Sequence, residues 1–213
     1  MPIGLAAVGA AWSFAADRIS ARWPAHEDGS QRAIGWRSVV TVLVGTLAGY
    51  LLAPFASDVP TLAFLGAYIV VLVVLLATDL DQRLLPDVLT LPLIPYALLG
   101  AWLGWSPYVS FDSGFVLDVV AAVGLPLGFF ALSIPFGRGA IGIGDLKFLV
   151  GAALVAGAER AVLGVVAGAL LSAVVIVVLI ATRRITLHSY VPYGPFLIIG
   201  ILWALLGPAM RGA

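Results

Sequence analysis

Long apolar windows, separated by short polar segments, follow one another along almost the whole chain. A bilayer core about 30 Å thick requires roughly 20 apolar residues in a helix. Eight windows approach that requirement, of which the first and the sixth are short: residues 1–16, 38–57, 59–78, 88–111, 119–137, 148–158, 161–182 and 189–210. The pattern predicts an all-α fold, a polytopic membrane bundle of about eight transmembrane helices that forms one membrane-embedded domain over residues 1–213.

The basic residues are distributed unevenly over the segments between these windows. Eight spans put successive connections on alternate sides, and one side then receives Arg18, Arg22, Arg32, Arg37, Arg83, Arg138, Lys147, Arg183 and Arg184. The other side receives only Arg160 and Arg211. Cytoplasmic loops carry the excess of Lys and Arg, so the richer side is predicted to be cytoplasmic and both termini are predicted outside.

Composition narrows the classes of function that such a chain can serve. Hydrophobic residues make up 62% of the 213 residues and charged residues only 10%, which is typical of membrane proteins that contact lipid. The net charge of +0 gives no indication of a nucleic-acid partner. The absence of cysteine excludes thiolate metal ligands and cysteine nucleophiles, and the longest polar insert, the predicted cytoplasmic loop 17–37, is too short to fold alone.

Two aspartates stand at the ends of predicted spans on the same, cytoplasmic, side. Asp79 follows the third window, and Asp145 lies beside the sixth, whose 11 residues are too few to cross a bilayer. The sixth helix must therefore begin before Phe148 and include part of "GIGDLK", residues 142–147. A carboxylate at the hydrocarbon edge is costly and commonly marks a functional polar site.

An alternative is that Asp145 simply pairs with Lys147 in the headgroup region. Residues two apart on a helix point about 200° from one another, so that pair would require irregular backbone. Gly142 and Gly144 would permit such a backbone, and they would also allow another backbone segment or an extended substrate to approach closely. The two interpretations remain open at this level.

Asp81 and Asp87 compete with Asp79 for a functional role. In a continuous helix Asp81 would point away from Asp79, and Arg83 is close enough to neutralise it. Asp87 follows Pro86 and precedes an apolar run, which suits the first turn of a new helix. Position at the end of the span favours Asp79 over Asp81 only modestly.

Two carboxylates brought within a few ångströms of one another do not both ionise readily. The ionised member can take a proton from water as the water attacks a carbonyl carbon, while the protonated member hydrogen-bonds the carbonyl oxygen. This is the chemistry of an aspartic protease, and it calls for no metal, cofactor or covalent nucleophile.

Three stretches of the chain resemble motifs of the bacterial type IV prepilin peptidases. They are "DLDQRLLPDVLTLPL" from Asp79, "GIGDLKFLVGAAL" from Gly142 and "VPYGPFLIIG" from Val191, in the order expected for that family. The resemblance implies catalytic motifs over residues 79–90 and 142–147. The family's first catalytic aspartate lies seven residues before the proline, which here is Pro86, so the resemblance selects Asp79. Asp145 corresponds to the second, with Gly142, Gly144 and Lys147 as matched neighbours.

The resemblance also implies a substrate and a location. Members of this family are aspartic endopeptidases of the bacterial inner membrane, and they cut the basic leader from type IV prepilins or pseudopilins at the cytoplasmic face. Many relatives carry a cysteine-containing domain, associated with N-methylation of the product, between the first two spans. Loop 17–37 has no cysteine, so methylation by this chain is not expected. Asp81, Asp87, Glu27 and Asp28 are candidates for contact with a basic leader.

Two other functions would use the same carboxylates. One is a Gly-x-Gly-Asp intramembrane protease of other membrane proteins. The other is a proton-linked transporter, for which the chain shows neither an internal repeat nor a polar path through the remaining spans.

Overall fold

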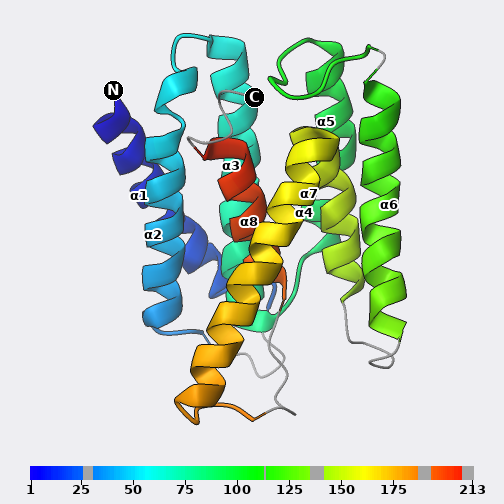
Figure 1. Ribbon diagram of the computed structural model, residues 1–213. Helices are drawn as coiled ribbons and strands as arrows, with labels where there is room; N and C mark the ends of the chain where they lie inside the picture. The colour runs from blue at the N-terminus through cyan, green and yellow to red at the C-terminus, as the bar shows by residue number, and fades with distance from the viewer. Residues whose placement is uncertain (26–30, 113, 135–141, 187–192, 208–213) are drawn as a thin grey trace.

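The computed structural model describes residues 1–25, 31–112, 114–134, 142–186 and 193–207. Within these ranges all regular elements are helices, which confirms the all-α prediction (Figure 1). They are α1 (Pro2–Ser20), α2 (Trp36–Leu51), the 3-10 helix η1 (Ala53–Phe55), α3 (Val59–Gln82), α4 (Asp87–Thr90), α5 (Leu93–Trp102), α6 (Phe115–Ser133), α7 (Ile143–Ala181) and α8 (Gly194–Leu206).

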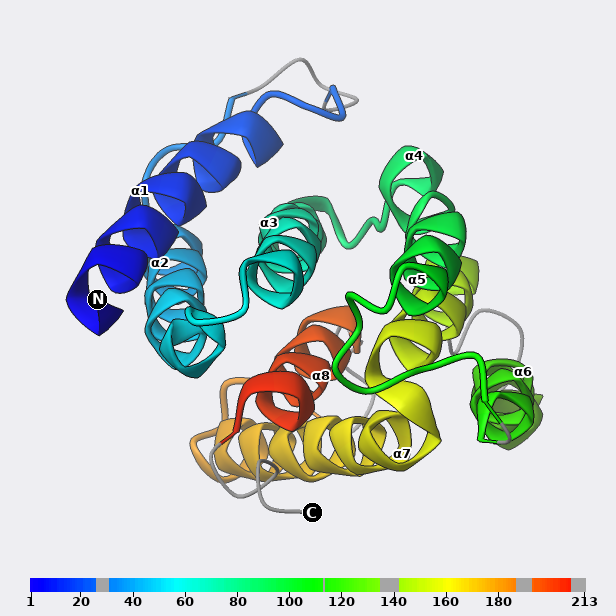
Figure 2. The ribbon, with the colours of Figure 1, turned by 90° about the horizontal axis from the view of Figure 1, so that it is seen from above.

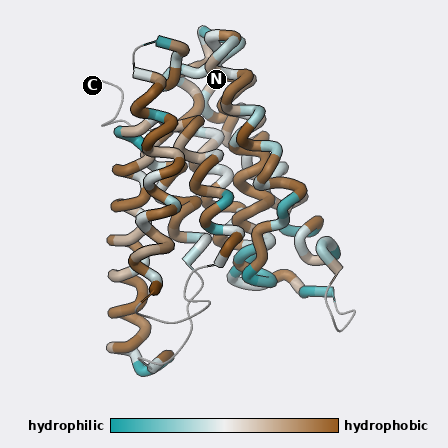
Figure 3. Tube along the Cα trace, turned by 90° about the vertical axis from the view of Figure 1, so that its right-hand side faces the viewer, coloured by the Kyte–Doolittle hydropathy of each residue, from teal (hydrophilic) through white to brown (hydrophobic). Residues whose placement is uncertain are grey.

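Several helices are long and apolar enough to cross a membrane. Within the described residues four helices meet that description, namely Trp36–Phe55, Val59–Gln82, Phe115–Ser133 and Ile143–Ala181. The shorter apolar helices there are Asp87–Trp102 and Gly194–Leu206. Hydrophobic colour runs along most of the helix lengths in Figure 3, while much of the hydrophilic colour lies toward their ends. A bundle with such an exterior suits a lipid environment, since lipid-facing helices are apolar on the outside.

Helix α7 consists of two helical arms joined at Gly157. Gly157 has φ 76° and ψ 165°, a combination open almost only to glycine. The second arm starts at the next residue, where the N–H of Ala158 donates to Oδ1 of Asp118 at 2.7 Å. Both arms descend from the upper end of the bundle in Figure 1, so they correspond to the sixth and seventh predicted windows. The first arm begins at Ile143, which confirms that the sixth helix extends to residues before Phe148.

The fourth and fifth windows needed correction at their boundaries. The helix expected over residues 88–111 is divided into α4 and α5 and ends at Trp102, because Pro92 interrupts the backbone hydrogen bonding and Gly104 adopts φ 68°. Helix α6 begins at Phe115, four residues before its window, and includes Asp118. Its carboxylate is tolerated there because it accepts the Ala158 N–H described above.

Helix α8 packs between α3 and the second arm of α7, as the view from above shows (Figure 2). Glycines make this crossing close: a Cβ added at Gly164 would lie 3.1 Å from the carbonyl oxygen of Gly200, and one at Gly168 would lie 2.6 Å from that of Phe196. The small residues at positions 164 and 168 thus allow the two helices to pack closely. The N-terminal end of α8 lies between the C-terminal end of α3 and the N-terminal end of α7.

Candidate active site

Asp79 lies in the last turn of α3 and is buried, with 4% of its surface exposed. The helix ends where Arg83 adopts the left-handed conformation, φ 56° and ψ 40°, and donates its N–H to the Asp79 carbonyl at 2.9 Å. Among the described residues, Oδ2 of Asp79 has no hydrogen-bond partner. A buried carboxylate oxygen without a partner is costly, which makes Asp79 a candidate for interaction with a substrate or water.

Asp145 lies in the first turn of α7, at the same end of the bundle as Asp79 (Figure 1). Gly142 caps this helix with extended backbone, φ −69° and ψ 140°, and its carbonyl accepts the Asp145 N–H at 3.1 Å. Other residues can adopt that backbone, so the irregular dihedrals considered for the Gly-x-Gly pair are not observed at Gly142. Asp145 is buried, with 8% exposed, and the first turn of a helix favours its negative charge.

Gly194, the first residue of α8, lies between the two aspartates. A Cβ added at Gly194 would overlap the Asp79 carboxylate and would lie 2.9 Å from Oδ1 of Asp145. Since both carboxylates approach this one point, their nearest oxygens are within about 5 Å of one another. The structure therefore brings Asp79 and Asp145 together.

The two carboxylates line one cavity of about 500 Å³. Its walls come from the end of α3, the start of α4, the start of α7 and the start of α8. The lining residues are Asp79, Arg83, Leu84, Leu85, Pro86, Asp87, Gly142, Ile143, Gly144, Asp145, Lys147, Tyr193 and Gly194. The cavity is large enough to admit an extended stretch of peptide as well as water.

Glycine at position 144 allows the segment after α3 to approach α7. A Cβ there would be 3.1 Å from Cβ of Leu85 and 3.3 Å from its carbonyl oxygen. Pro86 follows directly and forms the N-cap of α4. The matched glycine thus serves close packing of the two motif segments, which corresponds to the close approach predicted for it.

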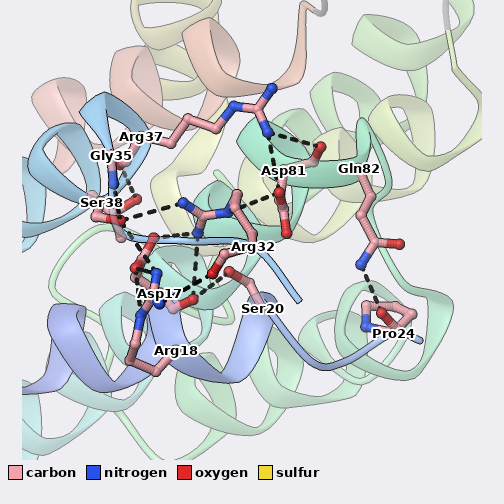
Figure 4. A network of polar contacts seen from close by, with 11 residues as sticks. Asp17, Arg18, Ser20, Pro24, Arg32, Gly35, Arg37, Ser38, Asp81 and Gln82 are labelled. Atoms are coloured by element: carbon pink, nitrogen blue, oxygen red, sulfur yellow. Dashed lines mark hydrogen bonds and ion pairs between the residues drawn. The ribbon is translucent and has the colours of Figure 1, made fainter. Parts of the chain in front are cut away.

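The remaining charged residues of the two motifs divide into separate contacts. Lys147 Nζ pairs with Oδ2 of Asp87 at 2.6 Å, so its partner is Asp87, not the Asp145 of the alternative interpretation. Asp87 begins α4, as predicted. Asp81 pairs with Arg32 at 2.8 Å and Arg37 at 3.1 Å, two residues of loop 17–37 that sequence reasoning did not connect with it (Figure 4).

Gly194 and Tyr193 are the site residues that sequence reasoning underestimated. Gly194 is the first residue of α8, which lies within the eighth apolar window, residues 189–210. Both residues also line the cavity. The signal was present in the aromatic-Gly-Pro pattern, but spacing alone does not reveal that a glycine beside a helix start faces two carboxylates. Val191, Pro192, Glu27 and Asp28 lie outside the described residues.

Among the side chains that the structure describes, no group of three or more His, Cys, Asp or Glu is arranged to hold a metal ion.

A helical membrane bundle with two buried aspartates in the wall of one cavity has the groups that an aspartic-type membrane peptidase uses. Residues 66–182 match the model of the Type IV leader peptidase family, which is more than half of the chain. The chain belongs to this family, as its motifs predicted. The match includes Asp79, Asp145 and their matched neighbours, whereas loop 17–37 and Gly194 lie outside it.

Individual relatives agree with the family match. The chain is 30% identical over 188 residues to the prepilin leader peptidase/N-methyltransferase of Aeromonas hydrophila, which covers 88% of this chain and 59% of the relative. A protein with the same description from Pseudomonas aeruginosa is 30% identical over 128 residues, which are 60% of this chain and 43% of the relative. Another from Dickeya chrysanthemi is 36% identical over 119 residues, which are 55% of this chain and 41% of the relative. This chain therefore spans about half the length of these relatives. No solved structure matches it.

Proposed function

We propose that this protein is an aspartic endopeptidase that removes the basic leader of type IV prepilins or pseudopilins, with Asp79 and Asp145 as the catalytic pair. The observation that carries the proposal is the convergence of both carboxylates on the backbone of Gly194 inside one cavity. Family membership supports the class of reaction. The relatives' printed description supports the class of substrate.

In the proposed mechanism one carboxyl group is ionised and the other protonated. The ionised group removes a proton from water as the water oxygen bonds to the scissile carbonyl carbon, and the protonated group hydrogen-bonds the carbonyl oxygen. When the tetrahedral intermediate collapses, the C–N bond breaks and a proton passes to the leaving amine. Two adjacent carboxylates in a poorly solvated site suit these opposite roles, because each raises the cost of ionising the other.

We further propose eight membrane crossings with both termini outside and the catalytic cavity at the cytoplasmic face of the bacterial inner membrane. The charge distribution supports this orientation. Arg18, Arg22, Arg32, Arg37, Arg83, Lys147, Arg183 and Arg184 belong to the helix ends and connections at the Asp79 end of the bundle, and Arg160 lies near the opposite end (Figure 1). Arg138 and Arg211 lie outside the described residues. By the positive-inside rule, the arginine-rich end faces the cytoplasm, where a prepilin leader is exposed.

The proposal includes cleavage and not N-methylation. The chain contains no cysteine, whereas the resemblance associates methylation with a cysteine-containing insert between the first two spans. In the structure, the described part of loop 17–37 forms ion pairs with the end of α3. Mass spectrometry of the released mature fragment, with S-adenosylmethionine supplied, should show a free N-terminus.

The decisive experiment is cleavage of a prepilin peptide by the purified protein in detergent. The peptide has a basic leader ending in Gly, and the wild-type protein should cut it after that Gly. Asp79→Asn and Asp145→Asn should each abolish the cut, whereas Asp58→Asn, at the opposite end of α3, should leave it. A protein that cuts unrelated single-span helices and not the prepilin would instead be an intramembrane protease. Proton-dependent uptake without any cleavage would indicate a transporter.

A further inference from the structure

An ion-pair network joins loop 17–37 to the end of the helix that carries Asp79. Asp17 at the end of α1 pairs with both Arg18 and Arg32. Arg32 also pairs through Nε with Oδ1 of Asp81 at 2.8 Å, and Arg37 pairs with the same oxygen at 3.1 Å. The Asp17 and Asp81 side chains are 0% and 3% exposed. Figure 4 shows Arg32 between the two acidic groups.

This network contacts the last turn of α3 on the side that faces away from the cavity. Asp81 follows Asp79 by two residues in the same helix, so the two side chains point about 200° apart. None of Asp17, Arg32 and Arg37 lines the cavity. The neighbouring Gln82 adds a further contact, since its Nε2 donates to the carbonyl of Pro24 at 2.7 Å. Loop 17–37 therefore contacts two successive residues, Asp81 and Gln82, in the same last turn of α3 as Asp79.

Asp79 has little of its own to hold it in place. Its Oδ2 has no hydrogen-bond partner among the described residues, and its backbone carbonyl accepts the Arg83 N–H at the end of the helix. A carboxylate in that situation is positioned mainly by the backbone of its helix. The backbone of this turn is tied to α1 and to the start of α2 through Asp81.

We infer that Asp81 is a positioning residue, which holds the last turn of α3 against loop 17–37 through Arg32 and Arg37 so that Asp79 faces Asp145. The inference rests on the proposed function. Buried ion pairs contribute little net stability compared with apolar packing. A charge-assisted hydrogen bond, such as the one that Arg37 Nη1 donates to Asp81 Oδ1 at 3.1 Å, is directional and fixes the geometry of the groups it joins. A displacement of about 1 Å at a reacting group is enough to slow a reaction up to about a hundredfold. The network thus fixes the position of the Asp79 carboxylate, which the contacts of Asp79 itself do not fix.

The test is the kinetics of prepilin cleavage by Asp81→Asn, Asp81→Glu and Arg37→Gln. Asp81→Asn keeps the shape of the side chain and removes its charge, and we expect kcat to fall about tenfold with KM within about twofold of wild type. Asp81→Glu can still reach both arginines and should recover part of kcat. Arg37→Gln leaves the Arg32 pair intact and should lower kcat about threefold.

The matched control is Asp58→Ala at the other end of the same helix. Asp58 is the N-cap of α3 and accepts hydrogen bonds from the N–H and hydroxyl of Thr61, at 3.4 and 2.5 Å. Its substitution should lower the melting temperature and leave kcat of the folded protein unchanged. A loss of kcat in Asp58→Ala equal to that in Asp81→Asn would assign the effect to general destabilisation and overturn the inference.

Other outcomes also decide the matter. If folded Asp81→Asn has wild-type kcat, Asp81 has no positioning role. If Asp81→Asn does not fold, Arg37→Gln carries the test, and wild-type kcat in that variant overturns the inference. Failure of the proposed function is a separate result, because it appears as absence of cleavage by the wild-type protein, or as retained cleavage by Asp79→Asn.

Discussion

Asp79 and Asp81 stand two residues apart in the same helical turn, and their surroundings are opposite. Asp79 faces a cavity, next to Gly194 and Asp145, and one of its oxygens has no hydrogen-bond partner among the described residues. Asp81 faces loop 17–37 and is paired with Arg32 and Arg37. Both aspartates are largely buried, so burial alone does not separate the carboxylate proposed as catalytic from the one that is paired. The two differ in that Arg32 and Arg37 form ion pairs with Asp81.

Helix geometry accounts for the different surroundings of the two side chains. A separation of about 200° sends one side chain into the cavity and the other to the outer face of α3. The same helix end can then carry both the carboxylate proposed as catalytic and the ion pairs of Asp81 with Arg32 and Arg37. The cavity face of α3 should be sensitive to any change in charge or volume, and the loop face should respond less.

The largest effect is expected on the cavity face, at Asp145. Asp145→Asn removes one member of the proposed pair, and cleavage of a prepilin peptide should fall by at least about 1,000-fold. In the proposed mechanism the two carboxylates act as a unit, so the double variant Asp79→Asn/Asp145→Asn should be no less active than either single variant. Steady-state and single-turnover rates on protein of confirmed helical content provide the measurement. Independent, multiplicative losses would show that the aspartates act separately.

Gly194→Ala should have the next largest effect. Its Cβ would overlap the Asp79 carboxylate and lie 2.9 Å from Oδ1 of Asp145, so at least one carboxylate must move. We expect kcat to fall about a hundredfold. The control is Gly124→Ala in α6, where an added Cβ meets nothing within 4 Å. Equal activity of Gly194→Ala and Gly124→Ala would mean that the carboxylates do not converge on α8.

Gly144→Ala tests the segment that leaves Asp79 for α4. The added Cβ would be 3.1 Å from Cβ of Leu85, which is tighter than usual and requires a shift of a few tenths of an ångström. A small shift of the segment that follows the Asp79 turn should lower kcat about fivefold, with a smaller change in melting temperature. A variant as inactive as Gly194→Ala would show that Gly144 contributes more than space for Leu85.

The smallest effect is expected for the Lys147–Asp87 pair at the rim of the cavity. Both side chains are partly exposed, at 33% and 55%, so the pair should contribute less than about 1 kcal/mol to the free energy of unfolding. Lys147→Gln should therefore change the melting temperature by only a few degrees. The same variant tests whether Asp87 contacts the leader, by comparison of KM for a peptide with a basic leader and one with a neutral leader. Lys147→Gln removes the ion-pair partner of Asp87, so KM for the basic leader should fall relative to KM for the neutral leader. An unchanged ratio of the two KM values would exclude Asp87 from leader contact.

Much of this arrangement could be predicted from the sequence because membrane helices are governed by a simple requirement for apolar length. The windows located the helices, and the shortness of residues 148–158 correctly required a helix that begins earlier. Helix periodicity separated Asp79 from Asp81. Asp79 and Asp145 were predicted to lie at the same end of the bundle because two spans, the fourth and the fifth, lie between them.

The remaining features depend on contacts between distant parts of the chain. Apolar length predicted a fourth helix to residue 111, yet α5 ends at Trp102. The partners of Asp81 come from loop 17–37, about 45 residues earlier, and many arginines of similar environment compete for that role. The contact of Gly194 with both carboxylates requires the crossing of α8 between α3 and α7, which no local pattern specifies.

The comparison between the two aspartates is tested most directly by single-turnover cleavage of one prepilin peptide by Asp79→Asn and Asp81→Asn, measured side by side with the wild-type protein. Both substitutions remove one negative charge and keep the side-chain shape. The account predicts a loss of at least about 1,000-fold for Asp79→Asn and about tenfold for Asp81→Asn. Similar residual rates in the two variants, or a greater loss for Asp81→Asn, would contradict it.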